Sequence, residues 1–212
     1  MKKMKVLVIA NQKDGVGKTA ISLHLAWYLA EQKKKVLFVD FDTQGNASYT
    51  FRKYPVITPA SKFLSSSNDV LPDLSKFEFD ENIAMISADN KLADIQSFNV
   101  TEIAENLISN INQIENEKLF DYCIIDTPPS LGNALAASLY IADYVISPIE
   151  LEVYSINGLA MMLKTINFVK RQNKELKFMG MLPSKVDGRN PRHKAHLAQL
   201  KNQYHELILP FS

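Results

Sequence analysis

The sequence is almost free of cysteine, since Cys123 is the only one among 212 residues. A single thiol cannot form an intrachain disulfide, and a cysteine-rich metal site is excluded as well. This composition fits a reducing compartment, so we expect a cytoplasmic protein.

The chain also lacks a long hydrophobic run and a strong net charge. The start MKKMKVLVIANQ has about five apolar residues before polar ones return, whereas a bilayer span needs roughly 20. It predicts a first β-strand, and we expect no membrane segment in the chain. With 24 basic and 23 acidic residues the net charge is +1, so any attraction to nucleic acid or a membrane must be local.

Short apolar runs do recur along the chain, with helical patterns between most of them. This alternation predicts βαβ units, and the nearly continuous hydrophobicity of the runs predicts helices on both faces of the sheet. We expect an α/β fold: one domain, residues 1–212, with a doubly wound, mostly parallel β-sheet flanked by helices on both faces. The runs are Val6 to Ile9, Val36 to Val39, Ile83 to Ile86, Tyr122 to Ile125, Tyr144 to Ile146 and Phe178 to Leu182.

The least patterned part runs from Phe51 to Phe79 and contains Pro55, Pro59 and Pro72. We expect an irregular excursion from the domain here, with a short helix around Lys62.

A phosphate loop is indicated between the first apolar run and the first helical pattern. The segment KDGVGKT supplies Gly15 and Gly17, which let the backbone approach an anion, then Lys18 for phosphate oxygens and Thr19 for Mg²⁺. The strict pattern G-x-x-x-x-G-K-[ST] is not met, because Gln12 stands at the first glycine position. Taken alone, the segment is also compatible with a turn that binds nothing.

Carboxylates at two other strand ends favour a nucleotide site. Asp40 and Asp42 close the run VLFVDFD on alternate residues, and Asp126 closes YCIID, the usual place for a carboxylate that holds Mg²⁺ through water. A strand that ends in one aspartate is weak evidence. Three strand ends with phosphate-site chemistry predict a bound nucleotide.

Together, the segments KDGVGKT, VDFDTQGNA, IIDTPPSLG and PIELEVYSINGL resemble the ParA/MinD group of deviant Walker-type ATPases, and ParA partition proteins most of all. The resemblance covers roughly residues 5–50 and 122–200. It implies a P-loop ATPase with ATP and Mg²⁺ as cofactors. The usual loop in that family is Lys-Gly-Gly-Val-Gly-Lys-Thr.

The resemblance also implies roles for single residues. Lys13 corresponds to the lysine that crosses an ATP-dependent homodimer to the partner's nucleotide, and Lys18 to the one that contacts its own. Asp42 corresponds to the residue that positions the attacking water, and Glu152 to a glutamate at the dimer face. The implied Mg²⁺ residues are Thr19 and Asp126, with Asp40 in the outer shell, and the implied nucleotide-binding residues are Lys13, Asp14, Gly15, Val16, Gly17, Lys18, Thr19 and Ala20.

Two residues depart from the family pattern. Thr43 replaces a proline, which changes the stiffness of its loop, and Asp14 replaces a glycine beside the phosphates and the dimer face. If position 14 needs a positive φ, aspartate fits it less well than glycine, and its charge repels a triphosphate. Our hypothesis is that Asp14 weakens ATP-dependent dimerisation and nucleotide affinity. The alternative is that its side chain points into water without effect.

The C-terminal part carries a basic cluster on an otherwise neutral chain. A helix over Arg192 to Leu207 places Leu197, Leu200 and Tyr204 toward the core. Lys194, Lys201 and His205 then form a basic stripe beside them, with Arg189 and Arg192 at its mouth. One interpretation is that these basic residues only form a solvated helix face. The resemblance favours binding of non-specific DNA instead, through Arg189, Arg192, Lys194 and Lys201.

The resemblance implies a function and two competitors. We expect a partition ATPase that is cytoplasmic and nucleoid-associated, whose hydrolysis a DNA-bound adaptor of ParB type stimulates to position plasmid or chromosome cargo. The competitors are a MinD-like ATPase at a membrane and a nucleotide-binding scaffold without hydrolysis. Iron–sulfur relatives are disfavoured, because they need more cysteine ligands than Cys123 supplies. The end LILPFS resembles a late strand after which family members continue for a few dozen residues, and the base of the nucleotide is expected near Pro183 to Asp187.

Overall fold

The computed structural model describes residues 3–77, 81–130, 132–151 and 155–210. Its central feature is a seven-stranded sheet in the order β3-β4-β2-β5-β1-β6-β7, in which every neighbouring pair is parallel. The strands are β1 (Lys5–Ile9), β2 (Val36–Asp40), β3 (Val56–Pro59), β4 (Ile83–Ser87), β5 (Tyr122–Asp126), β6 (Tyr144–Glu150) and β7 (Lys177–Ser184). The expected α/β doubly wound fold is confirmed.

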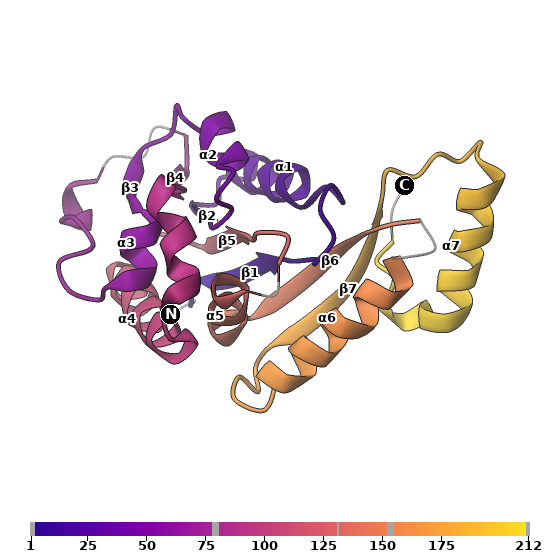
Figure 1. The fold of residues 1–212 in the computed structure, drawn as a ribbon. Coiled ribbons are helices and arrows are strands. Elements are labelled where there is room, and N and C mark those ends of the chain that lie inside the picture. The colour runs from indigo at the N-terminus through magenta and orange to yellow at the C-terminus, as the bar shows by residue number, and fades with distance from the viewer. Residues whose placement is uncertain (1–2, 78–80, 131, 152–154, 211–212) are drawn as a thin grey trace.

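Helices cover both faces of this sheet, with α1 and α2 on one face and α3 to α6 on the other (Figure 1). The helices are α1 (Lys18–Glu31), α2 (Asn46–Thr50), α3 (Ala60–Ser65), α4 (Val100–Glu117), α5 (Asn133–Ile141), α6 (Ser155–Val169) and α7 (Pro191–Tyr204), with 3₁₀ turns η1 (Leu74–Lys76), η2 (Asn90–Ser97) and η3 (His205–Leu207). No helix in the described ranges is both long enough and apolar enough to cross a bilayer.

Strand β2 shows why apolar and polar residues do not alternate in the apolar runs. All five of its residues are buried. Val36 and Phe38 pack into the core under α1 and α2, whereas Leu37 and Val39 pack into the core on the opposite face. Because successive side chains of a strand point to opposite faces, a strand covered on both sides has to be apolar throughout.

The segment from Phe51 to Phe79 is more ordered than its sequence suggests. The short helix around Lys62 is present as α3, but the expectation of an otherwise irregular excursion is wrong, because β3 adds an edge strand beside β4. Its four residues end in Pro59, and the outward-facing Val56 is 46% exposed. Proline is tolerated on an edge strand, where no neighbour needs its missing N–H.

Candidate nucleotide-binding site

Strand order brings the polar strand ends together at one edge of the sheet. Strand β5 lies between β2 and β1, and Asp126 is in register with Asp40 on one side and with Ile9 on the other. The phosphate loop follows Ile9 directly. In parallel α/β sheets, ligands bind at this carboxyl edge, where connections leave in opposite directions.

The phosphate loop leaves the start of α1 open. Gly15 and Gly17 have φ values of 72° and 90°, which glycine adopts without strain. Gly17 is the N-cap of α1, and within the described residues no side chain caps this end and no acidic residue lies in the first turn. The first N–H groups of the helix and its positive dipole end are therefore available to an anion.

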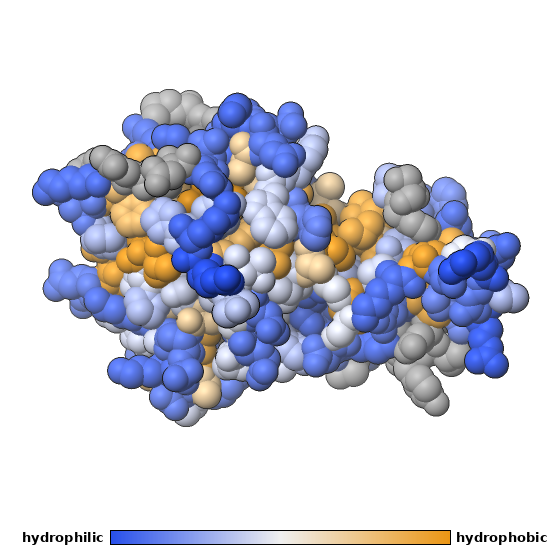
Figure 2. Space-filling view, turned by 90° about the horizontal axis from the view of Figure 1, so that it is seen from above, coloured by the Kyte–Doolittle hydropathy of each residue, from blue (hydrophilic) through white to orange (hydrophobic). Residues whose placement is uncertain are grey.

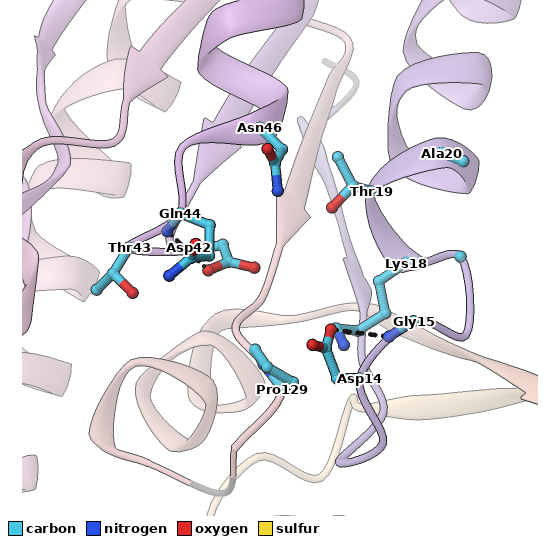
Figure 3. Close-up of a pocket in the computed structure, with 11 residues that line it drawn as sticks. Asp14, Gly15, Lys18, Thr19, Ala20, Asp42, Thr43, Gln44, Asn46 and Pro129 are labelled. Atoms are coloured by element: carbon cyan, nitrogen blue, oxygen red, sulfur yellow. Dashed lines mark hydrogen bonds between the residues drawn. The ribbon is translucent and has the colours of Figure 1, made fainter.

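A pocket of about 460 Å³ lies against this helix start (Figure 3). Asp42 and Gln44 face the phosphate loop from the other side, and Pro129 contributes from the loop after β5 (Figure 3). The lining residues are Asp14, Gly15, Gly17, Lys18, Thr19, Ala20, Asp42, Thr43, Gln44, Asn46 and Pro129. Six of the eight residues expected from Lys13 to Ala20 thus line one pocket. Val16 is fully buried, so any contact it makes with a ligand comes from its backbone.

Lys18 is a largely buried cation at the base of the pocket. Its Nζ donates to the carbonyl oxygen of Lys13 at 3.2 Å. Burial lowers the pKa of the Lys18 ammonium, while the carboxylates of Asp126, Asp14 and Asp42 oppose that shift. A phosphate group placed here would add the negative charge that favours the ammonium form.

Asp126 has the properties expected of a metal ligand. Its Oδ1 lies 3.1 Å from Ser22 Oγ, whereas its buried Oδ2 has no hydrogen-bond partner among the described residues. Burial raises the pKa of Asp126 to about 7, against the lowering effect of Thr19 and Ser22. An unpartnered carboxylate oxygen beside the Thr19 hydroxyl fits Mg²⁺, which takes one or two protein ligands together with phosphates.

Asp40 is engaged with its own loop. Its Oδ2 accepts hydrogen bonds from Ser48 N at 2.8 Å and Ser48 Oγ at 2.7 Å, and its Oδ1 accepts from Asp42 N at 3.0 Å. Burial raises the pKa of Asp40, although these hydrogen bonds oppose the shift. Through these contacts Asp40 orients the loop that carries Asp42. An indirect position, in the outer shell of the Mg²⁺ ion, is compatible with them.

Asp14 adopts a different geometry from the one considered above. It is not among the residues with positive φ, so the expected backbone strain is absent. Its Oδ1 accepts a hydrogen bond from Gly15 N at 2.7 Å (Figure 3). Asp14 thus lines the pocket and its carboxylate engages an N–H of the phosphate loop, while the residue remains exposed to solvent.

Lys13 lies outside the pocket lining and contacts strand β6. Its Nζ donates to Glu150 Oε2 at 2.6 Å. Its backbone N–H donates to Asn11 Oδ1, and the side-chain amide of Asn11 donates to the carbonyl oxygen of Pro148. The start of the phosphate loop is thus attached to β6 through Lys13 and Asn11. Glu152, expected at the dimer face, lies outside the described residues.

The basic residues of the C-terminal part are exposed but do not form one stripe. Lys194 and Lys201 are seven residues apart on α7 and share a face, whereas Arg192 lies two residues before Lys194, about 200° around the helix. Arg192 therefore lies on the opposite side of α7, near its start, and does not extend the face that Lys194 and Lys201 share. Arg189 precedes the helix and pairs with Asp187 at 3.3 Å.

Sequence reasoning missed the residues that hold the site in place. Ser22 contacts Asp126, Ser48 joins Asp40 to Ala88 N, and the Thr127 hydroxyl donates to the carbonyl oxygen of Ile9. One signal for Ser22 was available, because it is four residues after Lys18 and so lies on the same face of α1. Small hydroxyl side chains are too common to identify the others.

Comparison with known proteins agrees with this geometry. Residues 4–178 match a family described as an AAA domain. The protein IncC of Escherichia coli is 42% identical over 209 residues, which make up 99% of this chain and 58% of that protein. The chromosome partitioning protein ParA of Myxococcus xanthus is 30% identical over 230 residues, with 97% of this chain and 75% of ParA covered.

Among solved structures, cobyrinic acid a,c-diamide synthase from Mycobacterium smegmatis, with a bound ATP analogue and magnesium, has a TM-score of 0.80 at 30% identity; 95% of this chain and 83% of that one are covered. The chain spans 58% of the length of IncC, so similarity to IncC describes only part of that protein. From the match over residues 4–178 and the coverage of ParA, this chain belongs to the ParA-type ATPases, within the family described as an AAA domain.

Proposed function

We propose that this chain binds ATP with Mg²⁺ and acts as a partition ATPase. One arrangement carries the proposal. The uncapped start of α1 and Lys18 line one pocket, and the Asp126 oxygen that has no partner among the described residues belongs to a carboxylate beside Thr19 of the same pocket. These are the groups that bind phosphate and Mg²⁺ in P-loop enzymes. The similar structure with an ATP analogue and magnesium supports the same ligands here.

The proposed roles follow from position. Lys18 and the N–H groups of the loop hold the phosphates, Thr19 and Asp126 hold Mg²⁺, and Asp40 keeps the Asp42 loop in place. When bound, Mg²⁺ neutralises charge on the β- and γ-phosphates. Asp42, on the opposite side of the pocket from the loop, positions the attacking water. Phosphoryl transfer depends on positioning and charge far more than on covalent steps, so this set of residues is chemically suited to hydrolysis.

The partition cycle proposed here needs a second copy of the chain. In an ATP-bridged homodimer, Lys13 reaches the phosphates bound by the partner. The dimer binds DNA without reading its sequence, through Arg189, Lys194 and Lys201, and a DNA-bound adaptor of ParB type stimulates hydrolysis to move plasmid or chromosome cargo. This places the protein in the cytoplasm and on the nucleoid. ParA of Myxococcus xanthus, named as a chromosome partitioning protein, supports this cycle.

Co-sedimentation with non-specific DNA tests the proposal. We expect binding with ATP and Mg²⁺ and little without them. The double variant Lys194→Glu, Lys201→Glu should bind at least about tenfold more weakly, because two phosphate contacts become repulsive. The variant Lys91→Glu, Lys174→Glu changes two other exposed lysines by the same charge and should bind normally.

The outcomes separate the candidate functions. If the chain binds ATP but does not bind DNA with any nucleotide or without one, the MinD-like alternative is favoured. Co-sedimentation with lipid vesicles would then be the next measurement. ATP binding and dimerisation without hydrolysis, even when adaptor is present, would favour the scaffold. Absence of ATP binding would contradict the whole proposal.

A further inference from the structure

Glu150, at the end of β6, joins two lysines that are far apart in the sequence. Its Oε2 accepts from Lys13 Nζ at 2.6 Å, and its Oε1 pairs with Lys185 Nζ at 2.8 Å. The Glu150 side chain is only 15% exposed, and hydrogen bonds from Lys13 and Lys185 lower the pKa of its carboxyl. Both oxygens of one partly buried carboxylate are thus paired with ammonium groups. We call this set of three residues the Glu150 bridge.

The bridge lies along the edge of the phosphate loop. Lys13 is two residues before Gly15, and Lys185 Nζ lies 3.9 Å from the point that a Cβ on Gly15 would occupy. Beside it, Ser184 Oγ donates to the carbonyl oxygen of Val16 at 2.8 Å. The end of β7 is therefore fastened to the loop by one hydrogen bond and by the ion pair through Glu150. Any movement of Lys13 must first change this ion pair.

Charge explains what can open the bridge. Two ammonium groups and one carboxylate leave a net charge of +1, and a nucleotide phosphate carries more negative charge than Glu150. Lys13 is 34% exposed, so its amine can be approached from outside. A lysine ammonium forms strong charge-assisted hydrogen bonds with phosphate as well as with carboxylate, so a phosphate can replace Glu150 as the partner of Lys13.

We propose that Glu150 is a positioning residue that keeps the Lys13 ammonium in an ion pair as long as the chain is single. Lys185 weakens this ion pair, because it shares the same carboxylate. The Lys13–Glu150 contact opens when Lys13 transfers to the phosphates bound by a second copy, a step that rests on the proposed function. Formation of the dimer therefore competes with an ion pair inside each chain.

Two substitutions change this competition in opposite directions. Glu150→Gln keeps the size of the side chain but removes its charge, so Lys13 is held less and dimerisation becomes easier. Lys185→Gln leaves Glu150 with Lys13 as its remaining lysine, so Lys13 is held more and dimerisation becomes harder. Lys185 is 61% exposed, so this second variant carries the test if Glu150→Gln does not fold.

The first experiment needs no dimer. Lysine acylation by a small amine-reactive ester, read residue by residue by mass spectrometry, should rise about three- to tenfold at Lys13 in Glu150→Gln, because an ammonium in an ion pair reacts slowly. The variant Glu81→Gln removes the matching carboxylate from the Lys53–Glu81 pair, also 2.6 Å long, and should raise labelling at Lys53 alone. Unchanged labelling of Lys13 in Glu150→Gln would overturn the proposal.

The second experiment measures the ATP concentration at which half of the protein is dimeric, by light scattering. We expect a decrease of about three- to tenfold for Glu150→Gln, an increase for Lys185→Gln and no change for Glu81→Gln. An equal shift in the same direction for both bridge variants would overturn the proposal. If the unmodified chain never dimerises with ATP, the proposed function fails, and the labelling result still decides whether Glu150 holds Lys13.

Discussion

At the scale of single residues, the site holds carboxylates that are costly to bury. Asp126 and Asp40 are both fully buried, side by side in register on β5 and β2. Asp40 is compensated by three hydrogen bonds, whereas one oxygen of Asp126 has no partner among the described residues. This difference supports the proposed roles, in which Asp40 shapes the loop and Asp126 binds Mg²⁺.

Asp126 predicts a dependence of stability on pH. Its pKa of about 7 in the folded chain is above the ordinary value of about 3.9, so the folded state binds the proton more tightly than the unfolded state. Without ligands, the contribution of Asp126 to stability is greatest below about pH 4. It then falls by about 1.4 kcal/mol per pH unit until about pH 7. Asp126→Asn should remove this loss, so its melting temperature should exceed that of the unmodified chain at pH 8 but not at pH 4.

Two comparisons check this assignment. Asp94→Asn, at an exposed carboxylate, should show no such difference between the two pH values. Adding ATP and Mg²⁺ at pH 8 should stabilise the unmodified chain and have little effect on Asp126→Asn. A melting curve of Asp126→Asn that tracks the unmodified chain at every pH would contradict the raised pKa.

Asp14 predicts a gain of ligand binding on substitution. Its carboxylate occupies Gly15 N–H and brings a negative charge to the pocket. Asp14→Gly should therefore bind ATP about tenfold more tightly in a titration, since both the repulsion and the competing hydrogen bond are removed. Asp14→Asn keeps the size of the side chain without its charge, so it should fall between the two. Equal affinities in all three proteins would show that Asp14 is neutral.

At the scale of elements, α7 is attached to the molecule through a small contact. Among the described residues of α7, Leu200 is the buried one, with 3% of its surface exposed. It packs with Ile149, Leu151 and Met181. The Nδ1 atom of His196 lies 2.7 Å from the carbonyl oxygen of Leu151. α7 lies beyond edge strand β7 in Figure 1, and in Figure 2 the corresponding end of the molecule has hydrophilic residues on its outer side. The helix can thus present a polar face while a few apolar groups hold it.

Leu200→Ala should loosen α7 without unfolding the sheet. Removal of a buried leucine side chain costs about 2–5 kcal/mol, and here that loss falls on a peripheral helix. Amide hydrogen exchange should become faster over residues 191–204 and stay unchanged in β1, β2 and β5. Gln199→Ala, at the neighbouring exposed position, should leave exchange unaltered. Faster exchange across the whole sheet would mean that α7 is part of one cooperative unit.

At the scale of the whole molecule, the parallel sheet explains why distant segments form one site. The chain passes from β1 to β2 across β5, so the ends of three strands that are separated in sequence meet at one edge. The same sheet carries β6 and β7 on the other side of β1, which places Glu150 and Lys185 beside the phosphate loop. A single sheet edge therefore holds the pocket, the Glu150 bridge and the start of the segment that leads to α7.

The sequence by itself determined the six apolar strands, the phosphate loop and the carboxylates near it, because short-range patterns of hydrophobicity, glycine and charge encode them. It did not reveal β3, since a short edge strand that ends in proline lacks a continuous apolar run.

Tertiary structure alone decided the contacts that hold the site. Lys13 meets Glu150 across 137 residues, and Ser22 meets Asp126 across 104. Such pairs depend on strand order and register, which many sequences with the same local pattern could satisfy differently. The chemistry of the loop is local in the chain, whereas the ion pairs and hydrogen bonds that set its charge and geometry arise only when the sheet has formed.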